Sequence, residues 1–148
     1  LLKLVPVAAD CSAAQLAQAT VSLNTNPVTL VSSAEPTLLG FPDDGTAPPP
    51  GMGSVRILHA NWGLQPVSGV AVDTVTLAET TLAVGLAYGN GSAYLELPAA
   101  EYELRFYDTE ISALLYSGLN LQVNNSRIYS VIAGGAGTFN LFPMLLTD

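Results

Sequence analysis

YLELPAAEYELRFYD, at residues 94–108, decides the fold of this chain. In its second half, Tyr102, Leu104 and Phe106 fall on one face of an extended strand, and polar residues fall on the other. Such one-sided alternation is typical of antiparallel sheets that have one face in water. The segment LNLQV at 119–123 repeats the pattern with Leu119, Leu121 and Val123. These two stretches predict an all-β protein.

Further short strands are expected along the whole chain. The pairs Asn90-Gly91 and Asn124-Asn125 favour tight turns between them. Many short strands at a spacing of roughly 8–12 residues predict an antiparallel β-sandwich. The further strands are predicted at 2–7, 18–23, 27–32, 37–41, 54–59, 69–77, 81–86, 92–97, 127–133 and 138–146.

The beginning of the chain resembles its end. Residues 1–33 align with residues 101–133 without a gap, and identical residues include Asn24 and Asn124, and Val31 and Val131. Residues 54–100 precede the second copy, whereas nothing precedes the first. The expected organisation is therefore a partial module at 1–44, a linker rich in proline and glycine at 45–53, and a complete module at 54–148. The chain begins at Leu1 without a basic-then-apolar signal, so we expect a processed or truncated form.

The charge balance argues against several partners. Charged residues make up 11% of the chain, and the formal net charge is −8 with only four lysines and arginines. Nucleic-acid binding needs a basic patch, and attraction to an anionic membrane needs a similar cluster. No segment approaches the ~20 apolar residues of a membrane-spanning helix. We expect no nucleic-acid partner and no membrane insertion.

Three stretches resemble a known family: GSVRILHAN at 53–61, VSGVAVD at 67–73 and AYLELPAAEYELRFYD at 93–108. Together they are similar to the bacterial family known as domain of unknown function 4397, whose motif positions fall here on Arg56, His59, Pro98 and Tyr102. The resemblance implies an immunoglobulin-like or transthyretin-like sandwich in exported, often tandem, cell-surface proteins. The chain departs from the family pattern at Asn61–Pro66 and at Ala100-Glu101, which places a shared ligand site in doubt.

No residue pattern points to catalysis. His59 is the only histidine and Cys11 the only cysteine, so neither a zinc site nor a disulfide within the chain is expected. His59 ends a predicted strand and is interpreted as a structural histidine that bonds loop backbone. The chain contains no GxSxG elbow. We therefore predict that it is not an enzyme and needs no cofactor.

The carboxylates also favour structural roles. Asp43-Asp44, Asp108 and Glu110 could supply oxygen ligands for Ca²⁺, but no calcium-binding loop motif is present. Solvation of the linker and capping of turns are the favoured interpretation. The other carboxylates, Glu96, Glu101 and Glu103, are expected on the solvent face of strands, where they oppose edge-to-edge association.

Aromatic residues give the one candidate ligand surface. Trp62, the sole tryptophan, lies in a predicted loop and could stack on a sugar with Tyr88 and Tyr94, or could cover the end of the sandwich. Asn90 and Asn124 each fit the N-glycosylation sequon.

Two hypotheses of function remain from the sequence. The first is a non-catalytic extracellular structural protein, a subunit of a cell-surface assembly or filament, because the apolar face of a partial module has to be covered. Residues upstream of Leu1 or the neighbouring module of the same chain could cover it. Another copy, associating head to tail, or a neighbouring surface protein could also cover it by β-strand complementation. The second is an extracellular carbohydrate-binding or adhesion module.

Overall fold

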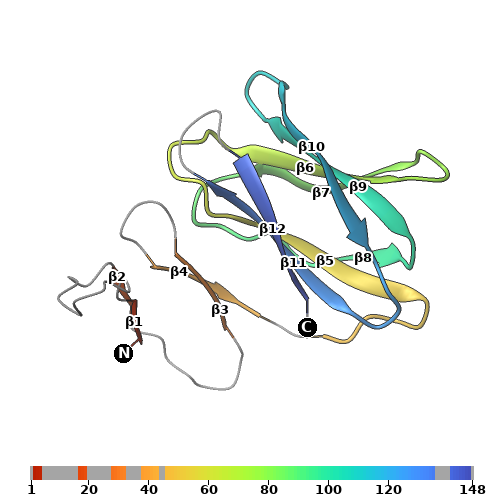
Figure 1. The fold of residues 1–148 in the computed structure, drawn as a ribbon, viewed down its shortest axis with the longest axis horizontal. Helices are drawn as coiled ribbons and strands as arrows, with labels where there is room; N and C mark the ends of the chain where they lie inside the picture. The colour runs from red at the N-terminus through yellow and green to blue at the C-terminus, as the bar shows by residue number, and fades with distance from the viewer. Residues whose placement is uncertain are drawn as a thin grey trace, which may run out of the picture.

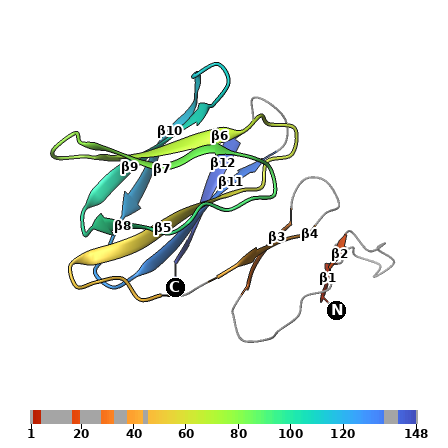
Figure 2. The same ribbon diagram turned by 180° about the vertical axis from the view of Figure 1, so that it is seen from behind.

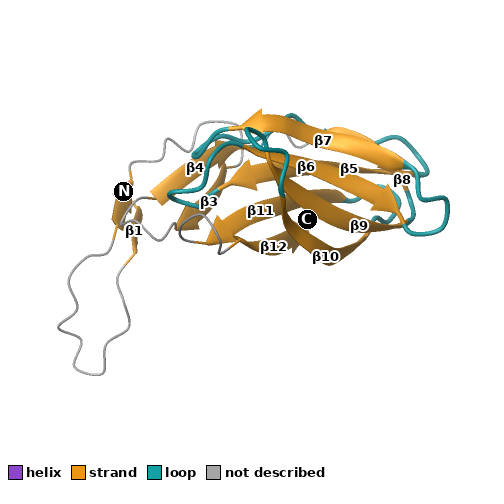
Figure 3. Ribbon diagram, turned by 90° about the horizontal axis from the view of Figure 1, so that it is seen from above, coloured by secondary structure: helices purple, strands orange, loops and turns teal. Residues whose placement is uncertain are grey.

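The computed structural model describes residues 2–4, 17–19, 28–32, 38–43, 46–135 and 141–147. Within these ranges every regular element is a β-strand, which confirms the prediction of an all-β chain (Figure 3). No helix among the described residues is long and apolar enough to cross a membrane. The strands are β1 (Leu2–Leu4), β2 (Ala17–Ala19), β3 (Val28–Ser32), β4 (Leu38–Pro42), β5 (Met52–His59), β6 (Val67–Asp73), β7 (Glu79–Leu86), β8 (Leu95–Pro98), β9 (Glu101–Asp108), β10 (Leu114–Gln122), β11 (Ile128–Gly135) and β12 (Leu141–Thr147).

The strands β5–β12 form two four-stranded sheets (Figure 1). One has the order β10-β9-β6-β7 and the other the order β12-β11-β5-β8. All pairs are antiparallel except β5 and β11, which run parallel. The prediction of a purely antiparallel sandwich is therefore wrong for this pair. Strands so far apart in the sequence are not joined by a hairpin, so no tight turn forces them to be antiparallel.

The core lies between the two sheets and follows the alternation in the sequence. In β9, Tyr102, Leu104 and Phe106 are buried, whereas Glu103 and Arg105 between them are partly exposed. They pack in one cluster with residues of the facing sheet, including Val55 and Ile57 of β5, which are fully buried. Period-two burial of this kind is what holds the two layers together.

Strands β5 and β11 are buried on their outer faces as well. The β3–β4 hairpin packs on the outside of the β12-β11-β5-β8 sheet, beside which Figures 1 and 2 show it. The second hydrophobic cluster joins Val31, Leu39 and Phe41 of the hairpin to Leu58, Ala60 and Ile132 of the sheet and its end. The apolar side chains described in the β3–β4 hairpin are thus covered by the neighbouring sheet of the same chain.

Several predicted boundaries are wrong. β8 begins at Leu95 instead of residue 92, and β10 begins at Leu114, five residues before the predicted segment 119–123. The strand predicted at 69–77 ends at Asp73, because its Oδ1 accepts hydrogen bonds from the backbone N–H groups of Val75 (2.8 Å) and Thr76 (2.7 Å). Leu77 closes this turn with a φ of 60°. The strand predicted from residue 54 begins earlier, at Met52, within the expected linker. Cys11 and parts of the strands predicted at 2–7, 18–23, 27–32, 37–41 and 138–146 lie outside the described residues.

Candidate functional site

The most elaborate polar site is built around Arg56, on the outer face of β5. Its neighbours Val55 and Ile57 point into the core, so alternation directs Arg56 outward. An outward arginine would normally reach water, but the β3–β4 hairpin covers it and leaves its side chain only 4% exposed. The site is therefore created by the docking of the hairpin on the sheet.

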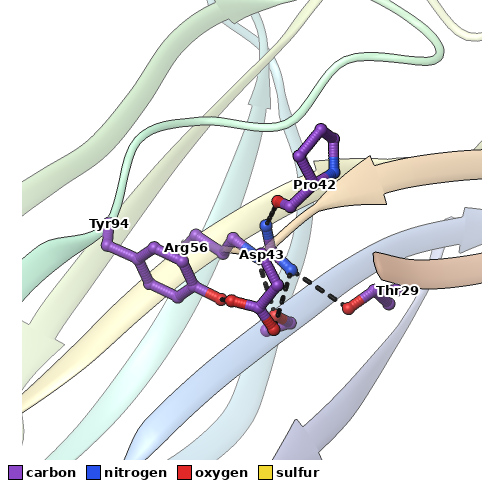
Figure 4. A network of polar contacts seen from close by, with 6 residues as sticks. Thr29, Pro42, Asp43, Arg56 and Tyr94 are labelled. Atoms are coloured by element: carbon purple, nitrogen blue, oxygen red, sulfur yellow. Dashed lines mark hydrogen bonds and ion pairs between the residues drawn. The ribbon is translucent and has the colours of Figure 1, made fainter. Parts of the chain in front are cut away.

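Arg56 contacts several elements at once (Figure 4). Its Nε donates to Ser130 Oγ of β11 at 2.8 Å, and its Nη1 donates to the carbonyl oxygen of Pro42 at 2.5 Å. Its Nη2 donates to Thr29 Oγ1 of β3 at 3.0 Å and lies 3.7 Å from Asp43 Oδ2. We call these residues, with Tyr94, the Arg56 clasp. It joins both strands of the hairpin to two strands of the sheet.

Tyr94 completes the clasp from the segment before β8. The guanidinium carbon of Arg56 lies 4.7 Å from the centroid of its ring, a cation–π distance. Its hydroxyl donates to Asp43 Oδ1 at 2.7 Å. Burial, helped by the hydrogen bond to the Asp43 carboxylate, raises the pKa of Tyr94 to about 12. Tyr94 therefore stays a protonated donor through the physiological pH range.

The contacts of the Arg56 clasp hold the β3–β4 hairpin against the sheet. The N–H groups of Arg56 point at acceptors of the protein and at no open space where a ligand would bind directly: they donate to Ser130, Pro42 and Thr29. The opposing carboxylate, Asp43, is only 7% exposed. A buried pair of this kind adds little net stability, but removing one partner is strongly destabilising, so it holds one specific arrangement.

His59 is the last residue of β5, the strand that carries Arg56, and its side chain is fully buried. The backbone N–H of Asn61 donates to its Nδ1 at 3.3 Å, so Nε2 carries the proton and donates to the carbonyl oxygen of Gln65 at 3.3 Å. Tyr88 packs against the ring edge-on, at 6.1 Å between centroids. Burial lowers the pKa of His59, and the bond to Gln65 opposes this in part. These contacts support the interpretation of a structural histidine.

Pro98 and Tyr102, which the sequence analysis singled out, come together at the β8–β9 corner. The hydroxyl of Tyr102 donates to the carbonyl oxygen of Pro98 at 3.0 Å. Burial, and then the negative charge of Asp73, raises the pKa of Tyr102. The bond fixes the entry of β9, whose apolar face forms much of the core.

The carboxylates differ in their roles. Asp43 does not solvate the linker, because it is drawn into the clasp. Asp108 caps a turn as expected, accepting from the backbone N–H groups of Glu110 (2.8 Å) and Ile111 (3.2 Å).

The glutamates on the strands lie nearer to solvent. Glu103 Oε1 lies 3.2 Å from Arg105 Nε. Glu96 and Glu101 are exposed on their strands. Within the described residues, no group of three or more acidic, histidine or cysteine side chains could hold a metal ion.

The three aromatic residues of the predicted ligand surface lie in different surroundings. Trp62 is 46% exposed. Tyr94 is engaged in the clasp, with Arg56 over its ring, and Tyr88 is partly buried against His59. Stacking on a sugar needs an open ring face, and Trp62 offers it better than Tyr94 does.

Both sequon asparagines are exposed at turns. The backbone of Asn90 accepts from His59 N–H at 2.9 Å, so its loop is tied to the end of β5. The Nδ2 group of Asn124 donates to the hydroxyl of Tyr129 at 3.2 Å. A glycan on Asn124 would have to share this nitrogen with that contact.

Sequence reasoning missed Thr29 and Ser130 as partners of Arg56. A hydroxyl on a strand carries no signal for the element that will cover it, so the clasp could not be found from the pattern. No protein-family model matches this chain, and no curated protein matches it either. The function therefore has to be argued from the geometry.

Proposed function

We propose that this chain is a non-catalytic structural protein of an extracellular assembly, a subunit in which consecutive β modules are locked together. The Arg56 clasp carries the proposal, since it ties the β3–β4 hairpin to the outer face of β5 and β11. Modules joined only by a linker move freely, whereas a buried polar joint favours one orientation. A fixed shape is what a filament or surface layer needs from its subunits.

The strand pairing supports an internal repeat. β1 pairs antiparallel with β2 and β3 with β4, as β9 pairs with β10 and β11 with β12. Val31 and Val131, which align in the sequence, lie in β3 and β11. On this proposal residues 1–44 are the trailing strands of one module and residues 54–148 are a complete one, with β5 extended back to Met52.

The strand order supports the transthyretin-like alternative within the predicted fold class. In the constant-type immunoglobulin order, the first two strands of the domain lie in the same sheet. Here the first two strands of the complete module, β5 and β6, lie in opposite sheets, and β5 pairs with β8 and β11. We propose the transthyretin-like class for the complete module on this ground.

An exported location is proposed from the uncharged polar surface and from the family resemblance. Antibody labelling of intact cells tests the location, and negative-stain microscopy of native material tests the assembly. We expect labelling without permeabilisation, and filaments or other ordered assemblies. Labelling only after lysis, together with isolated particles of single-chain size, would refute the proposal.

A carbohydrate-binding module is the second candidate, and the exposure of Trp62 favours it. The test is a glycan array with the wild type, Trp62→Ala and the matched control Tyr88→Phe, which keeps the ring beside His59. We expect a sugar ligand of the wild type to be lost only in Trp62→Ala, with an unchanged thermal melt. Equal binding by Trp62→Ala would remove this candidate.

A further inference from the structure

Strand β12 presents an unusual edge. It ends the β12-β11-β5-β8 sheet, and among the described residues no strand pairs with its outer side. Its seven residues, Leu141–Thr147, carry no charge and pair with β11 without a register shift. Phe142, Met144 and Leu146 alternate along its outward face and are 63%, 50% and 44% exposed.

The other sheet edges carry the usual protection against pairing. β8 is short and contains Glu96 and Pro98. β7 carries Glu79, and its pairing with β6 is interrupted by register shifts. The β10 ladder is likewise irregular. Charges, short length and bulges are the devices by which proteins keep sheet edges apart. A proline on the edge strand is a further such device, and Pro143 is the one protection of this kind in β12.

The apolar strip of β12 continues a surface that the protein already uses. Met144 pairs with Ile132, which is buried under the β3–β4 hairpin, and Leu146 pairs with Ser130 of the Arg56 clasp. The outer face of this sheet is thus covered over β5 and β11 and left apolar at β12. A contact there would extend the same packed layer.

We propose that β12 pairs edge to edge with β12 of a second copy, in antiparallel register centred on Met144. This deepens the proposed function by naming the surface and the partner. The register sets Phe142 against Leu146 of the second copy, so that apolar residues face apolar residues. Copies that each carry a net charge of −8 repel one another, and an uncharged edge is where they can approach.

The backbone agrees with this register. Proline has no N–H, so Pro143 fits a position whose backbone groups point away from β11. Alternation then directs the backbone groups of Leu141, Leu145 and Thr147 to the free edge. Leu145 N–H can donate to the Pro143 carbonyl of the second copy, and Leu141 and Thr147 can exchange two bonds. Pro143 removes one N–H donor from each copy, and the other backbone hydrogen bonds between the two β12 strands can still form.

The exposed parts of Phe142, Met144 and Leu146 amount to roughly 300 Å², against about 800 Å² per partner in a standard interface. The pairing is therefore weak for a single copy. It closes on itself as a two-fold dimer and would be strengthened where several modules are linked.

Sedimentation velocity over a range of concentrations tests the pairing in the whole chain. We expect concentration-dependent dimers of the wild type and a Kd raised at least about tenfold in Met144→Lys, which sets like charges opposite each other. Val84→Lys is the matched control, since Val84 is 74% exposed on the edge strand β7, and it should dimerise like the wild type. A wild type that stays monomeric, or equal loss in Val84→Lys, would overturn the pairing.

Oxidative cross-linking keeps the proposal testable if Met144→Lys does not fold. In a Cys11→Ser background, Met144→Cys should form a disulfide-linked dimer, because opposite residues in this register have Cα atoms about 4.5 Å apart. Val84→Cys should stay monomeric. No cross-link at Met144, with the hairpin still docked by Arg56, would refute the β12 contact and leave the proposed modular function standing.

Discussion

Replacing Arg56 by glutamine should release the β3–β4 hairpin from the sandwich. The change removes the cation 3.7 Å from Asp43 Oδ2 and the donors to Thr29, Pro42 and Ser130. Breaking a buried ion pair from one side typically costs about 3–5 kcal/mol, because the other charge stays buried without its partner. The sandwich keeps its own core, so we expect this free energy to be lost from the docking of the hairpin.

Amide hydrogen exchange measures the docking directly. A loss of about 3–5 kcal/mol predicts exchange in Val28–Ser32 and Leu38–Pro42 that is faster by roughly 150-fold to 5,000-fold. Protection of β9, which lies in the other sheet, should change much less. Adding Asp43→Asn to Arg56→Gln should recover part of the loss, since the double variant no longer buries an unpaired charge.

Arg105→Gln is the control for removing an arginine as such. Arg105 also contacts two carboxylates, Glu79 and Glu103, but its side chain is 31% exposed, so water screens the pairs. The Arg105→Gln substitution should therefore leave the amide hydrogen exchange of β3 and β4 unchanged. If Arg56→Gln changes this exchange by less than about threefold, the clasp does not hold the hairpin and the reasoning fails.

Three further changes test other parts of the structure. Tyr102→Phe should lower the free energy of unfolding by about 0.5–1.5 kcal/mol in urea titrations, because the carbonyl of Pro98 loses its donor. For His59, whose folded pKa is lowered from 6.5, stability should be constant above pH 6.5 and fall below it, since the unfolded chain takes up the proton first; a His59→Gln variant should lack this fall. Gly69→Ala should cost about 1–3 kcal/mol in thermal or urea unfolding, because the added Cβ would lie 2.1 Å from Ile57 Cδ1; an unchanged midpoint would refute this clash.

The core of the sandwich could be predicted because its signal is local. Leu104 and Phe106 alternate with Glu103 and Arg105, and a strand must turn such residues to opposite faces wherever it lies. Pro98 and Tyr102 were also singled out in the sequence, by a resemblance that stays a prediction. Their hydrogen bond needed only two residues that are close in the chain.

The sequence alone therefore determined the all-β class and the inward faces of the main strands. The tertiary structure decided the parallel pairing of β5 with β11 and the burial of Arg56. Both depend on which distant strand lies beside or over β5, and alternation records only that a side chain leaves the core. Whether it then meets water or another element is settled by packing between segments far apart in the chain.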